Sequence, residues 1–198
     1  MAENRKPMGT IGFKDFCIAE VLSDTEDGTS YGEVIKVAGA IDATLTPENT
    51  DPEVQYADDG EYDVVYPDPE VTFRTKLVDL PLEVRHKVFG HKMDANGVMV
   101  KNANDKGGYW AVGFRSEKAD HTDRYVWLYK VRAKPMVENY ATKEGETITR
   151  QNSEIEWAAI KRNYDGNYQT VGDVGLNGFT EEKAKTFLST VYEPVVAG

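Results

Sequence analysis

The strongest constraint on the fold is an alternation of apolar and polar residues with a period of two. In VTFRTKLVDL (residues 71–80), Val71, Phe73 and Leu77 fall on one face and Arg74 falls on the other. Successive side chains of a β-strand point to opposite faces, so this period indicates strands that are buried on one side. The pattern recurs along the chain and predicts a mainly β fold.

One run, YVWLYKV (residues 125–131), is apolar on both faces, which is typical of a central strand. Further alternating runs predict strands at residues 33–45 (interrupted at Gly39), 97–102, 109–117, 154–162 and 167–171. The dipeptides that separate these runs are typical of hairpin turns: Asn96-Gly97, Gly107-Gly108 and Asp165-Gly166.

Two segments with a helical period interrupt the strands. LPLEVRHKVFG (residues 80–90) has Pro81 as its first helical residue and Gly90 as its end. TEEKAKTFLSTVY (residues 180–192) begins with Thr180 as the N-cap, followed by two acids in the first turn. Strands with one mid-chain helix and one C-terminal helix predict two sheets packed as a β-sandwich and flanked by helix.

Composition narrows the class of protein. The 198 residues carry 23 Lys and Arg against 34 Asp and Glu, a formal net charge of −11. Such a balance argues against tight nucleic-acid binding, because phosphate contacts come largely from Lys and Arg.

Cys17 is the only cysteine and lies in apolar surroundings, so we expect a buried side chain and no internal disulfide. No apolar run approaches the roughly 18 residues of a membrane span, and the N-terminus has no apolar signal region, so we expect a soluble protein.

An acidic segment lies between residues 37 and 73, which contain ten acids and no Lys or Arg. At its centre, YADDGEYD (residues 56–63) surrounds one glycine with four carboxylates: Asp58, Asp59, Glu61 and Asp63. Prolines punctuate residues 46–68, which fit neither a strand nor a helix. A connection of about twenty residues is uncommon in a compact domain unless it is functional or disordered, so we expect a long projecting loop or hairpin.

These carboxylates do not match a known metal-binding pattern. A calcium loop requires oxygen ligands at fixed offsets from a central glycine, and placing Gly60 at the sixth position puts Gln55 first and Tyr66 twelfth. Zinc requires several His or Cys ligands, whereas His86 and His91 are five residues apart and do not share one helical face. We therefore expect no metal and no cofactor.

The sequence also contains no catalytic motif. No nucleophile elbow, P-loop or dinucleotide-binding glycine pattern occurs. With 34 acids in the chain, the sequence does not identify a carboxylate pair for glycoside hydrolysis, because such a pair is recognised only by the distance between its two carboxyl groups. Six aromatic residues of the predicted strands could stack on a sugar: Tyr109, Trp110, Tyr125, Trp127, Tyr129 and Trp157. Their alternation is more simply explained by a buried core, so we predict no catalytic residue and no enzyme.

Six segments in one order carry a resemblance: IGFKDFCIAEV (11–21), YGEVIKVAGAIDATLTP (31–47), YADDG (56–60), DLPLEVRHKVFGHKMDANGV (79–98), AVGFRSEKADHTDRYVWLYK (111–130) and WAAIKRNYDGNY (157–168). Together they span most of residues 11–192. In these segments the chain resembles the major tail (tube) protein family of long-tailed bacteriophages and prophages.

The resemblance implies a ring-forming β-sandwich and a structural role in the virion. Six copies would close into a hexameric ring, and stacked rings would form the tail tube through which viral DNA passes without specific binding. Further implied partners are other tail proteins, such as the tape measure and terminator proteins. The protein would be made in the host bacterial cytoplasm and then reside in the virion tail.

The same resemblance divides the chain into parts. Residues 1–10 look like an added N-terminal arm, residues 11–192 form the tail-tube domain, and residues 193–198 form a C-terminal tail. Within the domain, a long loop at residues 47–68 would reach the neighbouring ring, which makes its four carboxylates an inter-ring contact. We expect their basic partners on an adjacent copy to come from RSEK (115–118) or AIKR (159–162), namely Arg115, Lys118, Lys161 and Arg162.

Two other functions fit the sequence. An adhesion or carbohydrate-binding β-sandwich module would use the aromatic residues on a concave face and remain monomeric. A sheath, terminator or other tail component would form rings but no extended tube.

Overall fold

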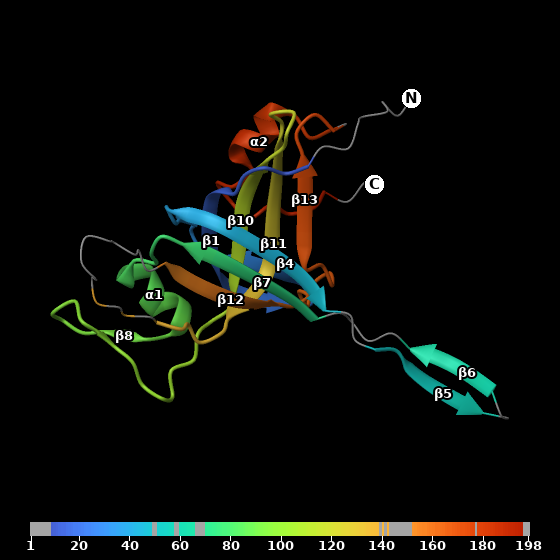
Figure 1. The fold of residues 1–198 in the computed structure, drawn as a ribbon, viewed down its shortest axis with the longest axis horizontal. Coiled ribbons are helices and arrows are strands. Elements are labelled where there is room, and N and C mark those ends of the chain that lie inside the picture. Colours follow the sequence, from blue (N-terminus) through green and yellow to red (C-terminus); the bar gives the residue numbers. More distant parts are fainter. Residues whose placement is uncertain are drawn as a thin grey trace.

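The computed structural model describes residues 9–48, 51–57, 60–65, 70–138, 140, 142, 152–176 and 178–195. The fold is mainly β, with two helices, as the sequence predicts (Figure 1). The strands are β1 (Lys14–Thr25), β2 (Gly28–Tyr31), β3 (Ile35–Lys36), β4 (Ala40–Glu48), β5 (Glu53–Ala57), β6 (Gly60–Val65), β7 (Glu70–Leu77), β8 (Lys92–Met93), β9 (Met99–Val100), β10 (Trp110–Glu117), β11 (Asp123–Ala133), β12 (Ser153–Ala159) and β13 (Gln169–Asp173). The helices are α1 (Leu82–Phe89) and α2 (Glu181–Phe187).

Nine strands form one antiparallel sheet in the order β2-β1-β10-β11-β12-β7-β4, with β13 beside β11 and β3 beside β1. One edge of β11 pairs with β10 along most of its length. The other edge pairs first with β13, at residues 124–128, and then with β12, at residues 131–133. Because β12 also pairs with β7, the two halves of the fold are parts of one sheet, and the predicted sandwich of two separate sheets is not confirmed.

The two halves of this sheet pack against each other around the larger hydrophobic core. The Phe73 ring of β7 stacks on the Phe114 ring of β10, with 5.5 Å between centroids. The Trp157 indole of β12 is buried in the same core and donates to the Thr75 hydroxyl at 3.1 Å. Val71, Phe73, Thr75 and Leu77 are buried while Arg74 is exposed, which confirms the predicted faces of β7.

A second core lies on the opposite face of β1, β10 and β11, under α2 and the residues that follow it. Trp127 is fully buried there and its indole N–H donates to the Phe187 carbonyl at 2.8 Å. Thr180 caps α2 as predicted, since its hydroxyl accepts from the Lys183 amide. β11 therefore contributes to both cores, which confirms the prediction of a central strand with two apolar faces.

Helix α1 and the residues just before it cover one end of the larger core, with the buried side chains of Val88 in the helix and Leu80 ahead of it. Pro81 is its N-cap rather than its first helical residue, and Gly90 ends it in the left-handed conformation with φ 71°. Gly97 has φ 77° in the tight turn between β8 and β9, so the predicted hairpin at Asn96-Gly97 is confirmed. The other two glycine dipeptides are not hairpin turns, because β9 does not pair with β10, and β12 and β13 both pair with β11.

The packing of Gly113 yields a test of the second core. An added Cβ at this position of β10 would come within 2.8 Å of the Trp127 ring. We expect Gly113→Ala to lower the free energy of unfolding by about 1–3 kcal/mol, because the indole is fully buried and cannot retreat. The control is Gly108→Ala, where a Cβ meets no atom within 4 Å, and it should stay within about 0.5 kcal/mol of wild type. Urea denaturation measures both, and equal stabilities would contradict this packing.

Candidate functional site

The acidic segment contains a β-hairpin. Strands β5 and β6 pair in register from Glu53 opposite Val65 to Ala57 opposite Gly60, with a bulge beyond the Gln55–Asp63 pair. They form a two-stranded sheet of their own, which projects away from the main sheet (Figure 1). The expectation of a projecting loop or hairpin at residues 47–68 is therefore met by a hairpin.

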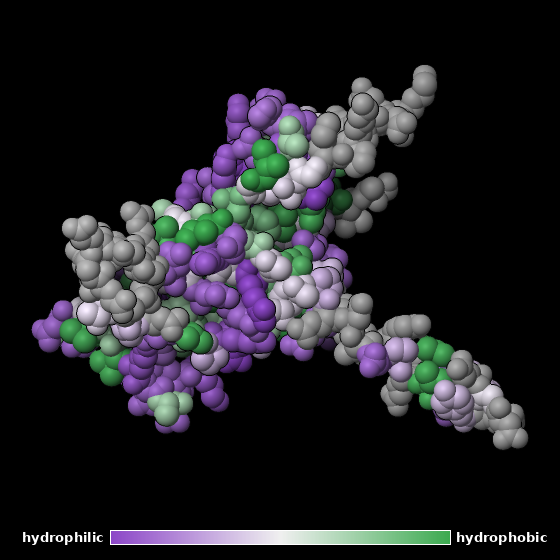
Figure 2. Space-filling model, viewed as in Figure 1, coloured by the Kyte–Doolittle hydropathy of each residue, from purple (hydrophilic) through white to green (hydrophobic). Residues whose placement is uncertain are grey.

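This hairpin, which we call the acidic hairpin (residues 53–65), exposes apolar side chains as well as charge. Tyr56 and Tyr62 are 68% and 73% exposed, and Val64, which pairs with Val54, is also exposed. Figure 2 shows hydrophobic atoms on the surface of the projecting strands. A two-stranded hairpin is at best marginally stable in water unless a third strand or another surface packs against it. Exposed aromatic residues on such an element indicate a surface that another molecule covers.

The four predicted contact residues all belong to this region. Asp58 and Asp59 lie outside the described residues. Glu61 and Asp63 lie on β6, where the Asp63 side chain is exposed and accepts a hydrogen bond from the Val64 amide at 2.9 Å. Tyr56 and Tyr62, which lie beside them, are not among the predicted contact residues. The signal that could have indicated them is the order V-Q-Y and Y-D-V on either side of Asp-Gly, which is typical of a hairpin.

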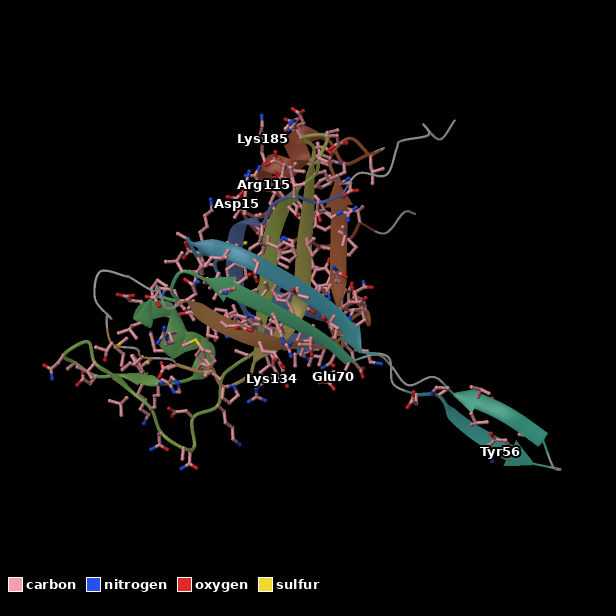
Figure 3. All side chains as sticks on the ribbon, viewed as in Figure 1. Asp15, Tyr56, Glu70, Arg115, Lys134 and Lys185 are labelled. Atoms are coloured by element: carbon pink, nitrogen blue, oxygen red, sulfur yellow. The ribbon has the colours of Figure 1, made fainter. Side chains whose placement is uncertain are left out.

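Three of the four predicted basic partners, Arg115, Lys118 and Arg162, form ion pairs within the chain. Arg115 donates to Asp15 at 2.6 Å and to Asp123 at 2.9 Å, and Figure 3 shows Arg115 beside Asp15 and far from Tyr56 of the hairpin. Lys118 forms an ion pair with Asp173, which also accepts from Arg124 at 2.6 Å. Arg115 and Lys118 thus stabilise the edge where β10, β11 and β13 meet.

Arg162 is the most enclosed of the predicted partners. Its side chain is 0% exposed and donates to Asp165, to the Tyr31 hydroxyl and to both oxygens of Glu193. The guanidinium carbon lies 3.9 Å from the centroid of the Tyr129 ring. Arg162 therefore fastens the C-terminal segment to the body, and it could meet a second copy only if Glu193 moved away. Lys161, the fourth predicted partner, is exposed.

The main sheet also has open margins. β4 pairs with β7 along one edge, and no strand in the described part of the chain pairs with its other edge. A groove of about 660 Å³ lies between β4 and β13. Ile41 and Val171 line it and are 42% and 50% exposed. An unpaired strand edge beside exposed apolar side chains is a template for pairing with another chain.

The described residues show no cluster of metal ligands and no exposed thiol. No group of three or more His, Cys, Asp or Glu side chains among them is placed to hold a metal ion. Cys17 is buried, and burial raises the pKa of its thiol to about 12, so it packs as a small hydrophobe as predicted. None of the described helices is long and apolar enough to cross a membrane.

The chain matches a known protein family. A family model described as phage tail tube protein matches residues 24–195 of the chain. The matched range includes the acidic hairpin, both helices and every strand from β2 onward. No curated protein matches the chain.

The ion pairs of Asp173 predict a loss of stability in acid. Hydrogen bonds from Arg124 are the largest cause that lowers the pKa of Asp173 from 3.8 to about 2. The ionised carboxylate therefore stabilises the fold above about pH 4, and this contribution is lost as the pH falls towards 2. We expect Asp173→Asn to lower Tm at pH 7 and to flatten its decline between about pH 4 and pH 2. Asp27→Asn is the control, since exposed Asp27 forms no ion pair with a described residue; parallel Tm curves for D173N and wild type would contradict the assignment.

Proposed function

Because the chain belongs to the phage tail tube protein family, we propose that it assembles into hexameric rings that stack to form the tube through which viral DNA passes. Family membership makes the protein a structural component of the virion tail. The role that we propose is structural rather than catalytic, and it requires no cofactor.

The observation that carries this proposal is the open edge of β4 beside the groove that Ile41 and Val171 line. Pairing between copies would satisfy the free backbone groups of this edge and bury the exposed apolar side chains. A contact between two different surfaces of identical chains closes into a ring when the rotation between copies allows it. The unpaired edge of the sheet thus supports assembly between copies of the chain. A monomeric β protein would have to block pairing at such an edge.

Charge supports the passage of DNA. Six copies would carry a formal charge of −66, six times the −11 of one chain. A negative wall repels phosphates within a Debye length of about 8 Å at physiological salt, so DNA could slide through the tube rather than bind to it. In this proposal the chain is made in the host bacterial cytoplasm and contacts other tail proteins, including tape measure and terminator proteins.

Rings also need a contact along the tube axis, and we assign it to the acidic hairpin. Its strands project from the body, its tyrosines are exposed, and its acidic residues can pair with cations on another copy. By contrast, an adhesion or carbohydrate-binding module gains no support, because Trp110, Trp127 and Trp157 are at most 1% exposed and cannot stack on a sugar.

Tube assembly should increase with salt. The chain is strongly anionic, so long-range repulsion between rings opposes stacking and is screened as ionic strength rises, whereas the exposed ion pairs of the hairpin contribute only about 0.2–1 kcal/mol each and lose less to screening. We expect negative-stain electron microscopy of the purified chain to show longer and more numerous tubes at about 0.5 M than at about 0.02 M NaCl. A monomer at every protein and salt concentration would contradict the proposed function.

Neutralising the hairpin should weaken stacking more than ring closure. The variant Asp58→Asn, Asp59→Asn, Glu61→Gln and Asp63→Asn removes four charges, each of which contributes about 0.2–1 kcal/mol as an exposed pair. We expect rings or short stacks where wild type forms tubes, as measured by microscopy under the same conditions. The control is Glu26→Gln with Asp27→Asn, in the turn between β1 and β2. Tubes of unchanged length in the hairpin variant would reject the contact.

A further inference from the structure

A groove with a positive lining lies between α1, the segment that follows β9 (residues 101–107), and the end of β11 with the residues after it, at one end of the molecule. Its volume is about 500 Å³. Five cations line it: Arg85, Lys101, Lys106, Arg132 and Lys134. Only two carboxylates do so, Asp105 and Glu138, which leaves a formal excess of three positive charges. This basic groove therefore stands out on a chain whose net charge is −11.

Within the described part of the chain, ion pairs engage three of the five cations and leave two without a carboxylate partner. Lys134 pairs with Glu156 at 2.6 Å and Arg85 pairs with Asp79 at 3.2 Å, although neither carboxylate lines the groove. Glu138 accepts from Arg85 at 2.9 Å and from Lys101 at 2.6 Å, and Asp105 contacts the His91 ring at 2.8 Å. Lys106 and Arg132 form no ion pair with any described residue, and both are exposed. The guanidinium carbon of Arg132 lies 5.6 Å from the centroid of the Tyr109 ring, which leaves its hydrogen-bond donors available.

The groove also presents an apolar surface. Phe89, Pro135 and Met136 line it between the cations, and the Phe89 ring stacks on the His91 ring with 5.9 Å between centroids. Methionine and aromatic side chains accommodate an inserted ring well. The surface thus suits a segment that combines carboxylates with exposed aromatic residues.

The acidic hairpin has this chemistry. Residues 53–65 contain five carboxylates and no Lys or Arg, and they expose Tyr56 and Tyr62. Figure 1 places the hairpin at one end of the long axis, whereas α1 and β8 lie at the other end. A contact between these two surfaces therefore joins different copies head to tail, and such a contact can repeat without limit.

We propose that the acidic hairpin of one copy docks in the basic groove of a second copy, with Lys106 and Arg132 as the cations that its carboxylates meet. This inference rests on the proposed function and assigns the receptor surface for the inter-ring contact. It replaces the partners expected from the sequence, since Arg115, Lys118 and Arg162 already form ion pairs within the chain.

Charge reversal tests this pairing. Lys106→Glu with Arg132→Glu should raise the protein concentration needed for half-maximal tube formation about tenfold or more, because attraction becomes repulsion at every contact. Adding Glu61→Lys and Asp63→Lys to the same chain restores the net charge of the chain and gives the hairpin two cations for the two new carboxylates of the groove. This combined variant should return to within about threefold of wild type. The matched control is Lys36→Glu with Lys185→Glu, which makes the same change in charge at two residues that do not line the groove and should retain more of the assembly. Figure 3 shows Lys185 far from Lys134, which lines the groove.

Disulfide cross-linking provides a second measurement, which remains informative if a charge variant fails to fold. Cys17 is buried and inert, so cysteines introduced by Asp63→Cys and Lys106→Cys are the reactive pair. Mild oxidation of assembled D63C/K106C should give a ladder of covalent oligomers on a non-reducing gel. The D63C/K185C control should remain a monomer.

These outcomes separate the inference from the proposed function. If wild type forms tubes but K106E/R132E assembles equally well, or the combined variant stays defective and no ladder forms, the groove is not the receptor and the tube role stands. If wild type forms no tube under any condition, the proposed function fails and the docking inference falls with it.

Discussion

The fold depends on the burial of β11 on both of its faces. Trp127 on one face and Leu128 on the other are fully buried, and the strand is hydrogen-bonded to β10, β12 and β13. Two cores are thereby fixed on opposite sides of one strand, with α1 closing the first and α2 the second. Because a single strand contributes side chains to both cores, the two halves of the sheet cannot separate. The unpaired edges of the sheet lie at the surface.

The proposed function rests on two features that lie outside the two cores. The body buries its three tryptophans, yet the free edge of β4 and the two-stranded acidic hairpin remain uncovered in the described structure. Backbone donors and acceptors of a strand edge are strong hydrogen-bonding groups that another chain can pair with. For a member of the phage tail tube protein family, both features are suited to contacts between copies: the edge around a ring and the hairpin along the tube.

The local pattern of apolar and polar residues predicts those strands and helices that are buried on one face and exposed on the other. The alternation around Phe73, the cap at Thr180 and the end of α1 at Gly90 follow from residues within one turn or strand. β1 was not predicted as a strand because Phe16, Cys17, Ile18 and Ala19 are buried in succession, which removes the period of two. The single sheet depends on pairing between β11 and β12, and the basic groove brings together Lys106 and Arg132, so both arise from contacts that no local pattern encodes.

The central claim is that copies of this chain complete the uncovered edge and hairpin. Amide hydrogen exchange, measured by mass spectrometry on unassembled and assembled protein, tests this claim most directly. The account predicts that β4 and the acidic hairpin exchange rapidly in the free chain and become protected on assembly, while β11 is protected in both states. Unchanged exchange at β4 and residues 53–65 in assembled material would contradict it.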